Sequence, residues 1–231
     1  MKYIAIDAST EACSVALYLD GQVFSKFELC PQSHSVVLLP MIDALLQEHK
    51  VALTDLDGLI YGQGPGSFTG VRIGIGVAQG WAFGAGLQTV GVSTLQAMAQ
   101  QAYEDEGQTN VFAAIDARMS EIYAGHYQLA DNGLMTLNGD EVNVQPADVS
   151  SHLTGISSDC FMVGTGFDTY TEALQNFSIS KTSPSILYPN AKAMLSIGIE
   201  KFKQGLEKPA EEAQPVYVRD TISWKKLPGR E

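Results

Sequence analysis

The string AIDAS at residues 5–9 returns as AIDAR at residues 114–118, and this repeat decides the fold that the sequence predicts. The first copy belongs to a short apolar run typical of a buried strand, and both copies precede an alternating segment, Ser14 to Leu19 and then Ile122 to Leu129. The two copies stand roughly half the chain apart. This pattern predicts an α/β protein of two similar lobes, with mixed sheets whose first strands are antiparallel.

Residues 1–106 are predicted to form the first lobe. Three strands in a meander open it, and Asp20-Gly21 is expected to form the hairpin turn between the second and the third. A helix follows, capped by Ser33 or Ser35 and ending near His49, in which Pro40 predicts a kink or a later start. The other expected elements are strands at Tyr3 to Asp7, Val23 to Leu29, Leu56 to Tyr61 and Thr89 to Val92, a glycine-rich loop at Gly62 to Gly70, and helices at Val71 to Phe83 and Ser93 to Glu104.

Residues 107–231 are predicted to form a second, more degenerate lobe after an acidic, polar linker from Glu104 to Asn110. An Asn132-Gly133 turn follows its first strands, and Glu211 to Glu231, which contains Trp224, has the character of an exposed tail available for docking. The other expected elements are a short helix near Pro146 to Leu153, a strand at Cys160 to Val163 that leads into Gly164-Thr165-Gly166, and a helix from Asn190 to Gly205.

The composition is that of a folded globular protein that does not grip nucleic acid by itself. Of the 231 residues, 45% are hydrophobic and 17% are charged, which excludes disorder, collagen and coiled coil. Lys and Arg number 14 against 26 Asp and Glu, and the net charge of −12 opposes binding to a phosphate backbone or an anionic membrane. Three scattered cysteines indicate reduced thiols in the cytosol, and Asp7 and Glu11 interrupt any signal-peptide core.

Residues 70–86 form the longest weakly charged stretch and must be tested as a membrane span. Arg72 and Gln79 leave fewer than the ~18 unbroken apolar residues that a span requires. The glycines of this stretch indicate tight packing against protein instead. We therefore expect no membrane-spanning segment.

Asp7 and Asp116 are the candidate functional carboxylates, because each stands just past a strand and precedes small or polar residues. In α/β proteins this position often presents a carboxylate to a metal or a phosphate group. The commoner role of such an aspartate is to cap the turn that follows the strand. The duplication favours the functional alternative, because two lobes that each present an acidic turn toward a shared cleft can clamp a nucleotide.

The glycine-rich loop of residues 62–70 has two interpretations. Its backbone N–H groups at a helix start, with Arg72 nearby, could hold an anion. Alternatively, the loop is a tight turn in which Ser67 or Thr69 caps the helix. It is not a Walker A loop, because it contains no lysine, and its spacing does not match the dinucleotide-binding fingerprint.

The histidines predict no metal site. His34, His49, His126 and His152 are isolated in sequence, and no cluster of cysteines and histidines offers three or four ligands. A serine hydrolase is not supported either, because no Gly-x-Ser-x-Gly elbow is present.

Two helices carry more apolar surface than one lobe is expected to bury, and they form the predicted partner surface. Gly76, Gly80 and Gly84 stand four residues apart and make a flat ridge that lets another helix approach closely. The helix of residues 36–46 has the same apolar excess, although part of both surfaces must pack inside the lobe. The residues predicted to contact a partner are Val36, Leu39, Ile42, Leu46, Ile73, Val77, Gly80 and Trp81.

Three separated strings carry a resemblance to a known family: IDASTEACSVAL from Ile6 to Leu17, GQGPGSFTGVRIG from Gly62 to Gly74, and AAIDARMSEIY from Ala113 to Tyr123. The terminal WKKLPG extends the likeness to essentially the whole chain. With these motifs in this order, the chain resembles the TsaB family, also called YeaZ. The resemblance implies the two-lobed fold of actin, the sugar kinases and Hsp70, which agrees with the internal repeat.

The resemblance also implies a non-catalytic role. TsaB proteins are paralogues of TsaD, which transfers a threonylcarbamoyl group onto N6 of adenosine 37 in tRNAs that read codons beginning with A. TsaD holds a metal through a His-x-x-x-His motif, and the comparable stretch here, Val92 to Ala99, contains no histidine. The resemblance therefore implies no metal, no cofactor and no catalytic residue in this chain, and it traces older peptidase labels of relatives to the same lost motif.

The partners that the resemblance implies are TsaD, bound as a heterodimer through the first two helices, and the ATPase TsaE, which joins that heterodimer. Without TsaD the chain is expected to form a homodimer, and in neither state is it expected to bind tRNA directly. The alternative function is an enzyme that binds and hydrolyses ATP on its own. The residues assigned to a vestigial nucleotide cleft are Asp7, Ser9, Gly64, Gly66, Asp116, Gly164 and Gly166.

Overall fold

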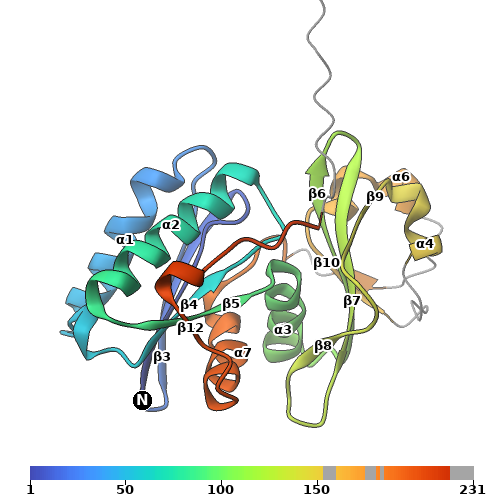
Figure 1. The fold of residues 1–231 in the computed structure, drawn as a ribbon. Coiled ribbons are helices and arrows are strands. Elements are labelled where there is room, and N and C mark those ends of the chain that lie inside the picture. The colour runs from blue at the N-terminus through green and yellow to red at the C-terminus, as the bar shows by residue number, and fades with distance from the viewer. Residues whose placement is uncertain (153–159, 175–180, 183–184, 219–231) are drawn as a thin grey trace, which may run out of the picture.

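The computed structural model describes residues 1–152, 160–174, 181–182 and 185–218. In this part of the chain, two six-stranded mixed sheets stand side by side, with helices on their outer faces and between them (Figure 1). This arrangement confirms the predicted α/β class. The tail predicted from Glu211 to Glu231 is described only as far as residue 218, and there the expected exposure is wrong in part, because Ala213 is buried in the core of the first lobe. The rest of that tail and the end of the helix expected at Pro146 to Leu153 lie outside the described residues.

The first sheet contains the predicted meander. β1 pairs antiparallel with β2, and β2 pairs antiparallel with β3 across the Asp20-Gly21 turn, where both residues have positive φ. β4 and β5 then add parallel to β1, and the late strand β12 closes the far edge. The strands, in spatial order, are β12 (Lys208–Pro209), β5 (Gln88–Val92), β4 (Gly58–Gly62), β1 (Lys2–Asp7), β2 (Ala12–Leu19) and β3 (Gln22–Leu29).

The second sheet repeats this pattern. β6 pairs antiparallel with β7 as β1 does with β2, and β10 adds parallel to β6 as β4 adds to β1. The sequence repeat therefore corresponds to a structural duplication. The strands are β6 (Asn110–Arg118), β7 (Glu121–Leu129), β8 (Met135–Leu137), β9 (Val142–Val144), β10 (Phe161–Val163) and β11 (Lys181–Thr182).

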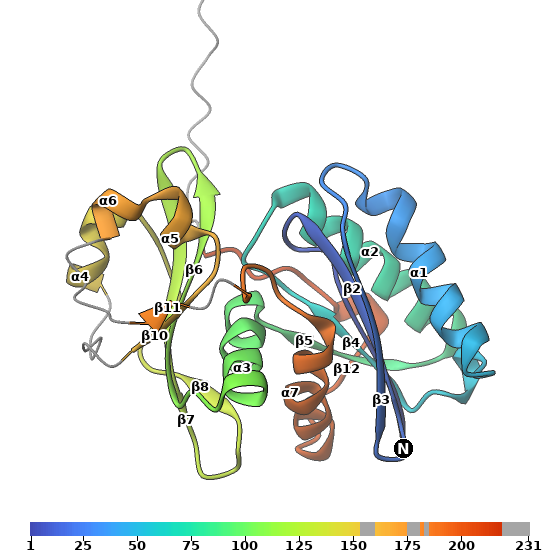
Figure 2. The same cartoon turned by 180° about the vertical axis from the view of Figure 1, so that it is seen from behind.

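The helices complete a layered structure that both views show (Figures 1 and 2). α1 (His34–Glu48) and α2 (Phe68–Ala85) cover the outer face of the first sheet. α3 (Thr94–Glu106) and α7 (Ala191–Lys203) lie between the two sheets. The short helices α4 (Val149–His152), α5 (Gly166–Thr169) and α6 (Thr171–Leu174) cover the outer face of the second sheet.

The helix ends follow from local sequence. Ser67 caps α2 by accepting the Gly70 N–H, so α2 begins at Phe68, three residues earlier than predicted. Gly86 ends it in a left-handed conformation with φ of 67°. Pro40 does not reset the start of α1, which runs continuously from His34 through it. None of the described helices is long and apolar enough to cross a membrane.

The chain returns to the first sheet near its C-terminus. α7 packs on β1, β2 and β4, and its Gly198 lies so close to Ile60 that an added Cβ would come within 2.4 Å of that side chain. β12 pairs with β5 of the first sheet. The division into residues 1–106 and 107–231 stays a prediction for the domains, but residues 191–213 lie with the first sheet rather than with the second.

Candidate functional site

A cavity of about 1000 Å³ opens between the two lobes. The turn after β1, the glycine-rich loop before α2 and the turn between β6 and β7 line it, and residues 216–218 complete it. These segments lie at corresponding ends of the two duplicated sheets, where an α/β protein usually binds its ligand. This cleft is the candidate small-molecule site predicted from the repeat.

Asp7 is buried within the first lobe, behind the residues that line the cleft. Its carboxylate accepts the Ser9 N–H and the Ser9 hydroxyl, each at 3.0 Å, and Thr94 Oγ1 in turn donates to the Ser9 Oγ at 3.0 Å. The residue is only 1% exposed and does not line the cavity. The hydrogen bonds to Ser9 are those of the turn-capping alternative.

Burial raises the pKa of Asp7 to about 6, against the weaker lowering effects of the Ser9 hydrogen bonds and the charge of His34. The folded protein therefore binds this proton more tightly than the unfolded chain does. Protonated Asp7 therefore favours the folded state, and this effect is fully present below pH ~4. As the pH rises from about 4 to 6 the free energy of unfolding falls, by about 3 kcal/mol in total.

This shift gives a prediction for the Asp7→Asn variant. Asparagine keeps an oxygen acceptor for the Ser9 N–H but does not titrate. The variant should therefore lack the change in unfolding free energy that the Asp7 proton causes. Between pH 4 and pH 7 we expect wild type to lose about 3 kcal/mol of unfolding free energy relative to the variant, measured by urea unfolding. The exposed-turn variant Asp131→Asn serves as control and should follow wild type. Equal pH dependence in wild type and Asp7→Asn would contradict the assignment.

Asp116, in contrast, lines the cleft, but its carboxylate is already engaged. Oδ1 accepts the Tyr170 hydroxyl and the Arg118 N–H, each at 2.9 Å, and Oδ2 lies 3.1 Å from the Arg118 guanidinium. Arg118 also reaches Glu11 of the first lobe at 2.7 Å. One guanidinium therefore joins the acidic turns of the two lobes across the cleft. Sequence reasoning did not find Glu11, Arg118 or Tyr170, because only the tertiary structure brings them together.

The glycine-rich loop packs backbone against backbone on the turn after β1. The Ser67 N–H donates to the Ser9 carbonyl at 2.7 Å, and an added Cβ at Gly66 or Gly70 would come within 2.2 Å of a carbonyl of that turn. These contacts support the tight-turn interpretation over anion binding. Arg72 is also engaged, because its guanidinium stacks on Phe68 and donates to the Tyr217 hydroxyl at 2.9 Å.

Gly164 and Gly166 play the equivalent role in the second lobe. An added Cβ at Gly164 would lie 2.1 Å from the Ala114 carbonyl, and Gly164 has a φ of 104° that favours glycine. Of the residues predicted for the nucleotide cleft, Ser9, Gly66 and Asp116 line the cavity. Asp7, Gly64, Gly164 and Gly166 do not; they shape the loops behind it.

The outer surfaces of α1 and α2 form an apolar face exposed to solvent, which we name the α1–α2 face. Val36 is 71% exposed, Leu39 40% and Phe83 70%, and an added Cβ at Gly76, Gly80 or Gly84 would meet no atom within 4 Å. Ile73, Val77 and Trp81 are half-buried at its margin. Glycines without neighbours on an exposed helix leave room for a close helical partner.

Two residues of the predicted partner surface are placed differently by the structure. Ile42 is fully buried and Leu46 is 6% exposed, and both belong to the core between α1, α2 and the first sheet. They are therefore core residues of this chain, not contact residues. The apolar positions of α1 cover more than one face, and sequence periodicity did not separate its inner face from its outer one.

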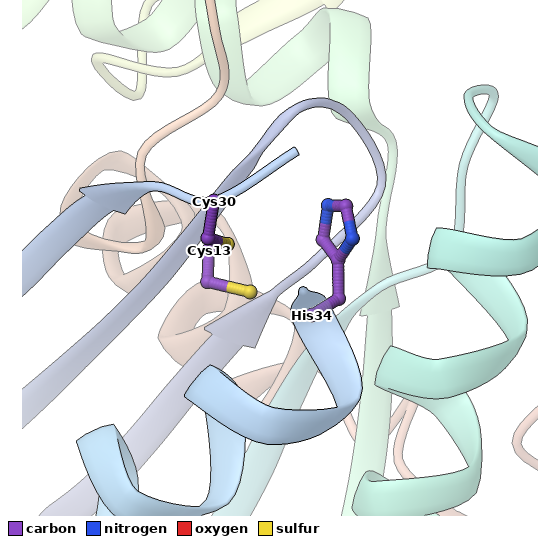
Figure 3. A group of neighbouring side chains, drawn as sticks. All are labelled: Cys13, Cys30 and His34. Carbon is purple, nitrogen blue, oxygen red and sulfur yellow. The ribbon is translucent and has the colours of Figure 1, made fainter. Parts of the chain in front are cut away.

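A group of potential metal ligands is present that sequence spacing did not predict. Cys13, Cys30 and His34 are all buried, and their ligand atoms lie within 4.8 Å of one another (Figure 3). The expectation that no three cysteines and histidines gather is therefore wrong. The predicted hairpin was the missed signal, because its register pairs Ala12 with Leu29 and so brings Cys13 close to Cys30, the residue that follows β3.

Two duplicated α/β lobes with mixed sheets and a cleft between them are the class of fold, that of actin, the sugar kinases and Hsp70, that the family resemblance implies. Residues 28–226 match the family model described as "TsaD: tRNA N6-adenosine threonylcarbamoyltransferase". The chain is 46% identical to the tRNA threonylcarbamoyladenosine biosynthesis protein TsaB of Escherichia coli over 100% of both chains. It is 40% identical to the TsaB of Haemophilus influenzae over 99% of this chain and 98% of the other. The chain belongs to the TsaB, or YeaZ, family.

A solved structure supports the same assignment. YeaZ from Pseudomonas aeruginosa has 42% sequence identity to this chain and superposes with a TM-score of 0.85, covering 94% of this chain and 99% of the other. A second structure with the same values is described as an uncharacterized protein with similarity to the peptidase YeaZ. The fold and the family thus agree with the resemblance seen in the sequence motifs.

Proposed function

We propose that this chain is a cytoplasmic, non-catalytic subunit of tRNA threonylcarbamoyladenosine biosynthesis that pairs with TsaD. The observation that carries the proposal is the α1–α2 face, because monomeric proteins rarely leave such a helical surface uncovered. The family supports it as well, since the full-length relatives are named for this biosynthesis and the matching family model is that of TsaD.

The residues of the cleft support a non-catalytic role. Asp7 caps a turn inside the lobe, and Asp116 is paired with Arg118 and Tyr170, so neither carboxylate points freely at a bound phosphate or metal. Residues 92–99, at the start of α3, contain no histidine. In this stretch Ser93 donates to Glu141 and Thr94 to Ser9, so both hydroxyls serve packing between elements.

The charge of the chain supports the proposal that a partner, and not this chain, binds the tRNA. A net charge of −12 gives no attraction to tRNA, so RNA binding is assigned to TsaD. TsaE is proposed to join the heterodimer, and a homodimer through the α1–α2 face is proposed for the chain alone. Such a homodimer would cover the same apolar surface until TsaD replaces one copy.

Light scattering and a modification assay test this proposal. We expect the pure chain to self-associate, and addition of TsaD to convert it into a one-to-one complex. Formation of threonylcarbamoyladenosine on tRNA by TsaD and TsaE should require this chain, while the chain alone should not retain tRNA at physiological salt. The proposal would be contradicted by a chain that stays monomeric and does not bind TsaD, or by tight tRNA binding to the chain alone.

The same preparation tests the alternative of an independent ATP-hydrolysing enzyme. The cavity of about 1000 Å³ is large enough for a nucleotide, which is the observation in favour of this alternative. Calorimetry with ATP and Mg²⁺ on the isolated chain distinguishes the two functions. Turnover of ATP that is abolished by Asp7→Ala would replace the scaffold proposal, whereas absence of turnover supports it.

A further inference from the structure

Cys13, Cys30 and His34 come together through the turn that joins β3 to α1. The Cys30 N–H donates to the Glu11 carbonyl at 3.0 Å, which extends the pairing of β2 with β3 and sets Cys30 diagonally across from Cys13. The Ser33 N–H then donates to the Cys30 carbonyl at 2.9 Å, with Pro31 and the positive φ of Gln32 at the two central positions. This is the geometry of a type II turn, and it places His34 beside the two thiols.

The three side chains are enclosed but not sealed off. Cys13 is 0% exposed, Cys30 5% and His34 8%. Figure 3 shows the Cys13 sulfur pointing toward the imidazole ring. His34 also lines the cavity between the lobes, so an ion could reach the cluster from the cleft. An enclosed group of soft donors with one side on a solvent-filled cavity has the access that metal binding requires.

From this cluster we propose that the chain binds one thiophilic dication, of which Zn²⁺ is the representative, through Cys13, Cys30 and His34. Zn²⁺ binds thiolates at ~2.3 Å and imidazole nitrogens at ~2.0 Å, so its ligand atoms stand roughly 3.5–4 Å apart. The present separations, within 4.8 Å when one of the two imidazole nitrogens is taken, exceed those of a formed site by about 1 Å. One position is left for water, as in zinc sites with three protein ligands.

The chemistry of the donors selects this class of ion. Binding forms two metal–sulfur bonds and one metal–nitrogen bond, and both thiol protons pass to solvent. Two thiolates neutralise a dication, so the loaded cluster of three ligands carries no net charge, which suits its burial. Soft thiolates disfavour Mg²⁺ and Ca²⁺, which prefer oxygen ligands.

The surroundings of His34 agree with a ligand role. Its Nε2 lies 2.6 Å from the Thr10 carbonyl oxygen, which can only accept, so Nε2 carries a proton. In the neutral imidazole the lone pair is then on Nδ1, and the ring has to turn to direct that nitrogen at the thiols (Figure 3). Metal-binding histidines characteristically donate one ring N–H to such an acceptor. The ion would tie β2, the end of β3 and the first residue of α1 to one another. It would therefore fix the start of the helix that carries Val36 and Leu39.

Titration of the reduced, full-length chain with Co²⁺ tests the proposal, because Zn²⁺ itself is spectroscopically silent. We expect one Co²⁺ per chain, a sulfur-to-cobalt charge-transfer band, and displacement of that band by one equivalent of Zn²⁺. Cys30→Ala and His34→Gln should each weaken binding about 10- to 100-fold or more. Zn²⁺ at 100 times its dissociation constant should raise the melting temperature of wild type by about 5–10 °C.

Cys160→Ser is the matched control. Cys160 is equally buried and its sulfur lies 3.7 Å from a histidine nitrogen, that of His126, but this pair has no third cysteine or histidine in the described part of the chain. The variant should keep one Co²⁺ site. Circular dichroism of the metal-free variants checks that each is folded. The proposal is wrong if the reduced wild type shows no charge-transfer band, if the band survives in folded Cys30→Ala, or if Cys13 and Cys30 prove to be joined by a disulfide in the cytosolic protein.

Discussion

The Gly80→Arg variant is expected to lose pairing with TsaD, by a factor of about 30 or more in affinity, while its own fold becomes no less stable. Gly80 lies in the middle of the glycine ridge of α2, and an added Cβ there meets no atom of this chain. An arginine is therefore accommodated in the isolated protein. In a close helix–helix contact the same side chain and its charge would have no room.

An unchanged melting temperature together with lost association distinguishes an interface residue from a residue needed for folding. Arginine favours a helix over glycine by up to about 0.8 kcal/mol, so at concentrations where wild type is monomeric the melting temperature of Gly80→Arg should equal or slightly exceed that of wild type. Self-association and TsaD binding, measured by light scattering and by titration calorimetry, should both be lost. Ala173→Arg, at an exposed helical position on α6 of the other lobe, should keep both.

Two outcomes would count against the α1–α2 face. Normal TsaD binding by Gly80→Arg would mean that the interface lies elsewhere on the chain. A variant that is unfolded would mean that the ridge packs against this chain itself, contrary to the open space around it. Leu39→Asp on α1 gives an independent test of the same face, because Leu39 is 40% exposed and belongs to the neighbouring helix.

The second large effect is a change in stability, expected when glycine is replaced by alanine at two positions of α2. Gly70→Ala should destabilise the protein by about 2–4 kcal/mol, because the new Cβ would lie 2.2 Å from the Ala8 carbonyl oxygen and the backbone must shift. Gly76→Ala should stabilise it by up to about 1 kcal/mol, since its Cβ meets nothing and alanine favours a helix over glycine.

Thermal and urea unfolding of the two variants measure this difference directly. For a chain of this length, each kcal/mol corresponds to about 2–4 °C in melting temperature, so the two variants should melt on opposite sides of wild type. Both glycines are in the same helix, so each variant is the control for the other. Equal destabilisation at both positions, measured at concentrations where the chain is monomeric, would mean that the outer ridge packs against this chain itself.

Much of the fold was predictable because it depends on local patterns. The alternating strands, the Asp20-Gly21 turn and the Ser67 cap of α2 act over a few residues, and the structure confirms them. The internal repeat predicted the two lobes, and the repeated strand pairing confirms the duplication. The return of α7 and β12 to the first sheet was not predicted, because nothing local in residues 191–209 records which lobe they pack on.

The candidate site was predictable in position but not in its contacts. The sequence placed acidic turns and glycine loops at one end of each sheet, and these segments do line the cleft. It did not decide that Asp7 points inward to Ser9, or that Arg118 joins Asp116 to Glu11 over more than 100 residues of chain. Side-chain direction at a strand end depends on the loops packed around it, which come from distant parts of the sequence.

The sequence by itself determined the class of this protein: the repeat, the glycine loops and the apolar helices predict two α/β lobes, and the motifs place the chain in the TsaB family. Only the tertiary structure decided which apolar residues of α1 and α2 face outward and that two thiols and an imidazole meet beneath them. The physical reason is the separation along the chain over which each kind of interaction acts. Turns and periodicities act between near neighbours, whereas burial and ligand clusters depend on residues that only the folded chain brings together.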